Sequence, residues 1–134
     1  MPAHFLAMLP NFLAYLATAI ALLAVFMAIY LHVTPYDEVA LIRANNTAAA
    51  ISLSGAVLGF ALPIANVIAH SDTLFDLAVW GVVAGIVQLL AWGVARVALP
   101  QLAEDIAAGR TAPASFVAAL SLTVGLINAA CMTY

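Results

Sequence analysis

The sequence predicts an all-α, polytopic membrane protein with four transmembrane helices in one domain, residues 1–134. Three observations lead to this prediction: an apolar composition, four long uncharged runs and an internal repeat. Hydrophobic residues make up 67% of the chain and charged residues 7%, against roughly 25% charged residues in an ordinary soluble domain. A small soluble fold cannot bury so much apolar surface, so lipid must be the solvent for much of it.

Four apolar runs are each long enough to cross a bilayer core of about 30 Å, which takes about 20 helical residues. They are residues 12–33, 48–69, 77–99 and 112–132. The charged residue inside them is Arg96, near the end of the third run, where its side chain can reach the headgroups. The N-terminal segment lacks the basic region of a secretory signal, so we expect the first span to be retained.

An internal repeat relates the two halves of the chain. Pro35 matches Pro100 at an offset of 65 residues, and Thr47 matches Thr111 at an offset of 64. We infer two tandem two-helix repeats, at about residues 11–70 and 76–134. Because each repeat holds an even number of spans, both copies should have the same orientation in the membrane.

The three arginines indicate which side faces the cytoplasm. Arg43, Arg96 and Arg110 lie in or beside the connections at residues 34–47 and 100–111. Cytoplasmic connections carry an excess of basic residues, so we expect both connections in the cytoplasm and both termini outside.

Each connection begins with a proline, continues with acidic residues and contains a short helical pattern, at residues 37–44 and 101–108. We expect these short helices to lie at the membrane interface. Their apolar residues, Leu41, Ile42, Leu102 and Ile106, should face the membrane. Their acidic residues would form a cytoplasmic acidic face: Asp37, Glu38, Glu104 and Asp105.

Helix caps are predicted at the ends of the connections. Asn46 or Thr47 should cap the second span, and Thr111 the fourth, after a helix stop at Gly109. A ligand-binding role for the edge at residues 45–47 is the alternative to capping and interfacial anchoring.

The polar residues inside the spans are uncharged, which argues against a proton-driven carrier but not against a passive pore. Small and polar residues form one stripe on the second span and a matching stripe on the fourth, 62 residues later. The members are Ser52, Gly59, Pro63, Asn66, Ser121, Gly125 and Asn128. These stripes either pack the helices, with the asparagines as interhelical hydrogen-bonding groups, or line a pore. Gln88, near the middle of the third span, needs a partner in another span or subunit.

No enzyme, metal or cofactor signature is present in the sequence. His32 and His70 fall at opposite membrane faces, and the position of His4 suggests no ligation. No nucleophile lies beside a base, so we expect no catalytic activity. Nucleic-acid binding is not expected without a basic patch.

Four segments resemble a known family. They are residues 34–38 (TPYDE), residues 41–49 (LIRANNTAA), residues 54–63, where Ser54, Gly55, Leu58, Gly59 and Pro63 carry the match, and residues 128–134 (NAACMTY). They are similar to the YjfL-like family of small bacterial inner-membrane proteins, built from a duplicated two-helix domain of unknown function. The resemblance covers nearly the whole chain. It implies four spans in a bacterial inner membrane, in which the termini that the arginines place outside would lie in the periplasm, and it brings no activity.

Two functions remain open. The first is a homo-oligomeric assembly that passes or senses an ion or small solute, with cations and polyamines as candidates because of the acidic face. The alternative is a membrane scaffold that docks a peripheral cytoplasmic protein through its acidic interfacial helices, in envelope stress or membrane maintenance; the stress context comes from the resemblance.

Overall fold

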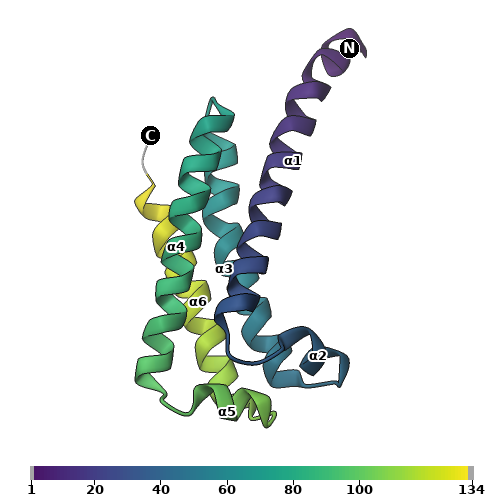
Figure 1. Ribbon diagram of the computed structural model, residues 1–134. Coiled ribbons are helices and arrows are strands. Elements are labelled where there is room, and N and C mark those ends of the chain that lie inside the picture. The colour runs from purple at the N-terminus through teal and green to yellow at the C-terminus, as the bar shows by residue number, and fades with distance from the viewer. Residues whose placement is uncertain (1, 133–134) are drawn as a thin grey trace.

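The computed structural model describes residues 2–132, which form helices and short connections without a strand. The helices are α1 (Pro2–Val33), α2 (Glu38–Arg43), α3 (Thr47–His70), α4 (Leu74–Ala98), α5 (Leu102–Ala107) and α6 (Thr111–Cys131). The short helices α2 and α5 lie at one end of the bundle, opposite both termini (Figure 1). We call this the α2–α5 end.

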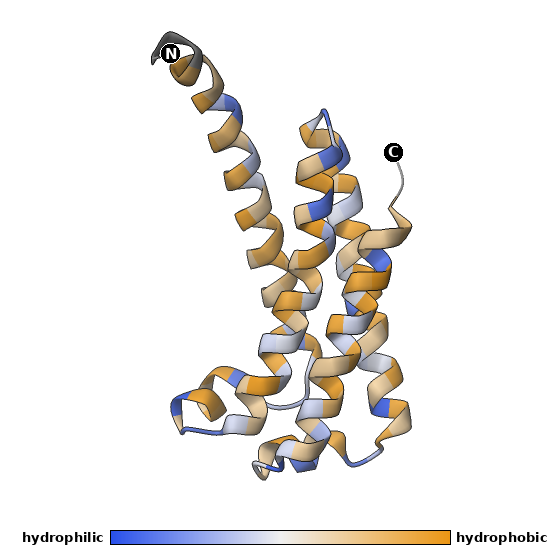
Figure 2. Ribbon diagram, turned by 180° about the vertical axis from the view of Figure 1, so that it is seen from behind, coloured by the Kyte–Doolittle hydropathy of each residue, from blue (hydrophilic) through white to orange (hydrophobic). Residues whose placement is uncertain are grey.

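The predicted fold class is confirmed, because α1, α3, α4 and α6 are each long and apolar enough to cross a membrane. Apolar residues run along all four helices, whereas many of the hydrophilic residues gather in the short helices and at the turn between α3 and α4 (Figure 2). The bounds of α1 differ from the prediction. The helix passes through Pro10 and begins well before residue 12. Phe5, Leu6 and Met8 extend the apolar run, and the helix continues through Pro10 although an interior proline removes the backbone hydrogen bond to the residue four positions earlier and crowds its carbonyl.

Helix α3 lies at the centre of the bundle and α1 at its margin. In the most apolar window of α3, 56% of the residues are buried, against 6% in α1. Helix α1 leans away from the other helices toward its N-terminus (Figure 1). A cavity of about 500 Å³ lies between this part of α1 and the turn that follows α3. Most of the apolar surface of α1 is therefore left uncovered by the rest of the chain.

Aromatic side chains attach the other half of α1 to the bundle. The rings of Phe26 on α1 and Phe60 on α3 are stacked, with centroids 4.4 Å apart. Tyr30 contacts Trp92 on α4 at a centroid distance of 6.3 Å. All four rings are buried. This cluster fixes α1 near the α2–α5 end, where the next segment of the chain begins.

The two connections share one backbone pattern. After α2, Asn45 has a φ of 68°, and 64 residues later Gly109 has a φ of 82°. In the first connection, the backbone N–H of Asn46 donates to the carbonyl of Leu41 at 2.9 Å; in the second, Arg110 donates to Asp105 at the same distance. These bonds define a Schellman motif, which suits glycine or asparagine in the left-handed position. The match supports a duplicated unit.

Candidate functional site

The two small-residue stripes face each other inside one chain, between α3 and α6. A Cβ atom added at Gly125 would collide with the backbone of Gly59, and one added at Gly59 would collide with the carbonyl oxygen of Ser121. Ser52 and Pro63 are also buried. At these points the two backbones leave no room even for a methyl group, so the geometry favours helix packing over a pore lining.

At the contact between α3 and α6, which we call the seam, some buried polar groups have hydrogen-bond partners and others do not. Gln88 on α4 donates from Nε2 to the carbonyl of Ser121 at 3.0 Å, so its partner is another span of the same chain. Asn66 donates from Nδ2 to the carbonyl of Ala129 at 2.9 Å. The Nδ2 atom of Asn128 is buried and has no hydrogen-bond partner among residues 2–132. The two asparagines, equivalent in sequence, therefore differ in structure.

The helix starts also differ between the copies. Asn46 is the N-cap of α3, and its Oδ1 accepts from the backbone N–H of Ala49 at 3.0 Å. Thr47 is the first residue of α3 and is exposed. The prediction that Thr111 caps the fourth span is wrong, because the N-cap is Arg110 and no side chain caps this helix. Sequence similarity at the repeat boundary therefore misplaced the cap by one residue.

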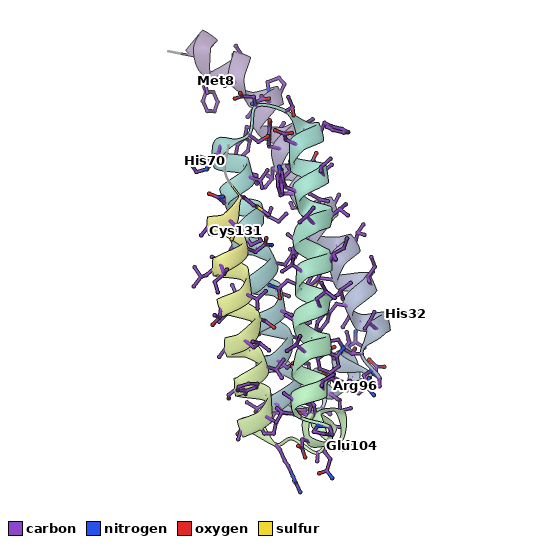
Figure 3. The ribbon with its side chains drawn as sticks, turned by 90° about the vertical axis from the view of Figure 1, so that its left-hand side faces the viewer. Met8, His32, His70, Arg96, Glu104 and Cys131 are labelled. Carbon is purple, nitrogen blue, oxygen red and sulfur yellow. The ribbon has the colours of Figure 1, made fainter. Side chains whose placement is uncertain are left out.

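The predicted acidic face does not include all four of its members. Asp37 accepts a hydrogen bond from the backbone N–H of Ala40 at 3.1 Å and is the N-cap of α2. Asp105 pairs with Arg110 at 3.3 Å. Glu104 is exposed at the α2–α5 end, on the same side of the molecule as Arg96 (Figure 3). The assignment of Glu38 to this face is wrong, because its exposed fraction is 1%.

The apolar side of α5 is also placed differently from the prediction. Leu102 and Ile106 are fully buried in the protein core rather than facing the membrane. In α2, Ile42 is exposed and Leu41 is half-buried against the core. Helix α5 is therefore held by contacts with the bundle, because a short amphipathic helix can bury its apolar side against protein as well as against lipid.

The buried carboxylate of Glu38 lies in a polar cluster that sequence reasoning missed. The cluster consists of Tyr30 on α1, Tyr36 in the following turn, Glu38 at the start of α2 and Ser52 on α3. Trp92 on α4 covers it, because this indole contacts the rings of both tyrosines at centroid distances of 6.3 Å. We call these four polar residues the Glu38 cluster.

Five oxygen atoms of the Glu38 cluster are buried without a hydrogen bond of good geometry among the described residues, although the Ser52 hydroxyl lies near both tyrosines and the Thr34 hydroxyl lies near Glu38. They are the hydroxyls of Tyr30, Tyr36 and Ser52 and both carboxylate oxygens of Glu38. Buried polar groups are normally hydrogen-bonded, since each unsatisfied group loses its interaction with water. An accumulation of five at one place therefore marks a functional-site candidate.

The surroundings of Glu38 disfavour a negative charge. Burial raises the pKa of Glu38 to about 7, and the nearby Thr34 hydroxyl opposes this shift. Burial and the charge of Glu38 raise the pKa of Tyr36, against the opposing effects of Ser52 and Arg96. No basic side chain of residues 2–132 forms an ion pair with Glu38. The carboxyl group therefore changes charge near neutral pH.

Comparison with known proteins identifies the family. A family model described as "Domain of Unknown Function (DUF350)" matches residues 4–132. The chain belongs to the DUF350 family. It is 37% identical over 131 residues to the UPF0719 inner membrane protein YjfL of Escherichia coli strain K12, covering 98% of this chain and 99% of that protein. The protein of the same name from Escherichia coli O157:H7 matches equally well.

No solved structure matches the chain. The resemblance to the YjfL-like family is confirmed, and this DUF350 protein is an inner membrane protein with four membrane-spanning helices. The family description names no activity. The Glu38 cluster falls within the matched residues, and Tyr36 and Glu38 belong to the TPYDE segment that carried the resemblance. That segment was a signal for the site, but its burial was not visible in sequence.

His32 and His70 lie toward opposite ends of the molecule (Figure 3), and the side chain of His4 lies outside the described part. Among the side chains that the structure describes, residues 5–132, no three His, Cys, Asp or Glu residues come together in a group that could hold a metal ion. The chemistry available at the Glu38 cluster is therefore that of one carboxyl group surrounded by neutral hydroxyls.

Proposed function

We propose that this DUF350 protein is a homo-oligomeric inner-membrane assembly that passes or senses a small cation, and that Glu38 is the group that receives it. The observation that carries the proposal is a buried carboxylate that makes no ion pair among the described residues and has uncharged hydroxyl groups around it. A buried carboxylate is strongly destabilised until a positive charge neutralises it. A proton or a small metal cation can supply that charge.

The charge of the site favours small cations over polyamines. Polyamines carry several positive charges along an extended chain, whereas the Glu38 cluster offers one negative charge in a buried position. Asp37 and Asp105 are already engaged, with the start of α2 and with Arg110. A single compact cation matches the single negative charge of the cluster.

The position of α1 and the closed contact between α3 and α6 support an oligomer. The contact between Gly59 and Gly125 leaves no passage between α3 and α6 in one chain. Most of α1 is exposed, so it can pack against another copy. A transport path would then lie between subunits, with the Glu38 cluster near its cytoplasmic end, which is the side that the arginines assign.

Purified protein in liposomes tests this function. We expect the wild type to conduct protons or Na⁺, Glu38→Gln to lose the flux, and Glu104→Gln to keep it, because Glu104 is an exposed acid at the same end. For sensing, the readout is the fluorescence of Trp92 in a Trp80→Phe background, titrated from pH 5 to pH 8. Absence of both flux and a Glu38-dependent fluorescence change would overturn the proposal.

The scaffold alternative now depends on a smaller surface, the exposed acids Asp37 and Glu104. The scaffold function is favoured by the fixed position of α5, because the Asn46 side chain at the start of α3 donates a hydrogen bond to the carbonyl of Ile106 in α5. Asp37→Asn keeps the α2 cap while removing the charge, so the double variant with Glu104→Gln tests the surface without unfolding it. If this double variant still recovers the same cytosolic partners, the exposed acids do not form the docking surface.

A further inference from the structure

We propose that the Glu38 cluster is an alkali-metal binding site, in which one dehydrated monovalent cation competes with a proton for the Glu38 carboxylate. This inference rests on the proposed function and names the cation. The four residues come from α1, the turn after it, α2 and α3, so a bound ion would join three helices at the α2–α5 end.

The ligand set has the composition that an alkali-metal ion requires. Five buried oxygens lack a hydrogen bond of good geometry among the described residues, and oxygen ligands replace the water of a hard cation when it enters a protein. Tyr30, Tyr36 and Ser52 supply three hydroxyl oxygens, and Glu38 supplies two carboxylate oxygens. Ser52 is near both tyrosine hydroxyls, which places these groups in one cluster.

The charge of the cluster selects a monovalent ion. One carboxylate balances one positive charge, whereas Ca²⁺ would remain undercompensated in a site without a second acid. The charged and titratable groups that face the carboxylate are Tyr30 and Tyr36, with Arg96 on α4 beyond Tyr36. A guanidinium near Tyr36 adds positive charge, which disfavours a divalent cation further.

A proton alone satisfies the cluster less completely. Protonation neutralises Glu38 and gives it one O–H donor, which can satisfy one of the hydroxyl oxygens of Tyr30, Tyr36 and Ser52. A metal ion contacts several of these oxygens at once and also neutralises the carboxylate. The two occupants exclude each other at Glu38, so binding of the metal must release the proton.

Thermal unfolding of purified protein in detergent tests the site. The reference buffer contains choline chloride, which cannot enter the cluster, and NaCl, KCl or LiCl replaces it at constant ionic strength. At pH 7.5 we expect at least one of these salts to raise the Tm by several degrees in a saturable manner. Addition of the same salt to a weakly buffered sample near pH 7 should release protons.

Substitutions of the ligand residues distinguish a loss of ion binding from a folding defect. Ser52→Ala and Tyr30→Phe retain the carboxylate but lose one oxygen each, so we expect a salt midpoint raised about tenfold while the response to pH remains. Glu38→Gln should abolish both the salt response and proton release, and Glu104→Gln should preserve both.

The outcomes separate this inference from the proposed function. A Glu38-dependent response to pH without any response to the three salts would overturn the metal site and leave the proton as the cation. A salt response that survives in Glu38→Gln would also overturn it. Saturable binding without flux or sensing would support the site as a structural ion while overturning the proposed function.

Discussion

Asn46 donates a hydrogen bond of 2.9 Å from Nδ2 to the carbonyl oxygen of Ile106, and thereby joins the first connection to the second. The same amide lies 3.3 Å from the carbonyl oxygen of Ala107, while Oδ1 caps the start of α3. One side chain therefore satisfies backbone groups at the start of α3 and at the end of α5. The equivalent position in the second copy is Arg110, which makes no capping bond. The duplicated connections have thus taken different structural roles.

Asn46→Ala should lower the stability by about 2 kcal/mol, because it removes a cap and a hydrogen bond worth about 1 kcal/mol each. Asn46→Ser should lose roughly half as much, since a serine can still cap α3 but cannot reach α5. Thermal unfolding in detergent measures both, with the exposed neighbour Thr47→Ala as a control that stays near wild type. Equal effects of alanine and serine would contradict the link to Ile106.

The seam between α3 and α6 should reject any added methyl group. At Gly59 and Gly125 a Cβ would meet backbone atoms of the opposite helix, which cannot move aside without separating the helices. We expect Gly59→Ala and Gly125→Ala to reduce folded yield strongly. In contrast, no heavy atom of the described residues lies within 4 Å of a Cβ added at Gly93. Gly93→Ala should therefore be neutral or slightly stabilising, and a loss of yield there would challenge this account.

Asn66 and Asn128 should respond differently to the same substitution. Asn66→Leu removes the hydrogen bond to Ala129, which in a membrane is worth roughly 0.6 to 1.7 kcal/mol. Asn128→Leu removes a buried Nδ2 that has no partner among the described residues, so it should be neutral or stabilising. Chemical unfolding in mixed micelles compares the two at nearly constant side-chain volume. Equal destabilisation would show that Asn128 has a partner that this conformation does not contain.

The Glu38 carboxyl group should make the protein less stable as the pH rises through the acid range. Its pKa is about 7 in the folded protein against an ordinary value of 4.5. Between these values the folded state binds the proton more tightly than the unfolded chain does. The stabilisation is therefore complete below about pH 4.5 and is lost as the pH rises to about 7.

In choline buffers the loss should reach about 3 kcal/mol, because each pKa unit corresponds to about 1.4 kcal/mol. The measurement is the Tm of wild type and Glu38→Gln at intervals from pH 4.5 to pH 8. The difference between their two curves isolates the contribution of Glu38. A wild-type Tm that rises relative to Glu38→Gln over this interval would contradict the prediction.

The spans and short helices were predictable because their signals are local. A run of about 20 apolar residues identifies each long helix, and a proline followed by acids identifies each short one. The burial of Glu38 was not predictable, because the groups near it come from other elements: Tyr30 lies on α1, and Trp92, more than fifty residues away on α4, contacts the rings of Tyr30 and Tyr36. In the sequence Glu38 stands beside Asp37, and nothing local separates a buried acid from a capping one.

The role of the small-residue stripes and the tilt of α1 were also not predictable from the sequence. Stripes of glycine, serine and asparagine fit a packing seam and a polar lining equally well in sequence, and the collision of Gly125 with Gly59 is a property of two helices together. Leucine-rich surfaces of α1 are stable against lipid or protein alike, since lipid chains are as apolar as leucine. Residue patterns therefore could not say how far α1 stands from the bundle.

The pairing of α3 with α6 also sets an order of events during synthesis. Helix α1 is made first and has the highest mean hydropathy of the four spans, so it can enter the bilayer as an independent helix. Helix α3 enters later with Gly55, Gly59 and Asn66 on the side that its final partner will cover. That partner, α6, leaves the ribosome after α3, α4 and α5. The contact between α3 and α6 therefore cannot form until α6 has been made, and a chain truncated before α6 would remain in the membrane with its core unassembled.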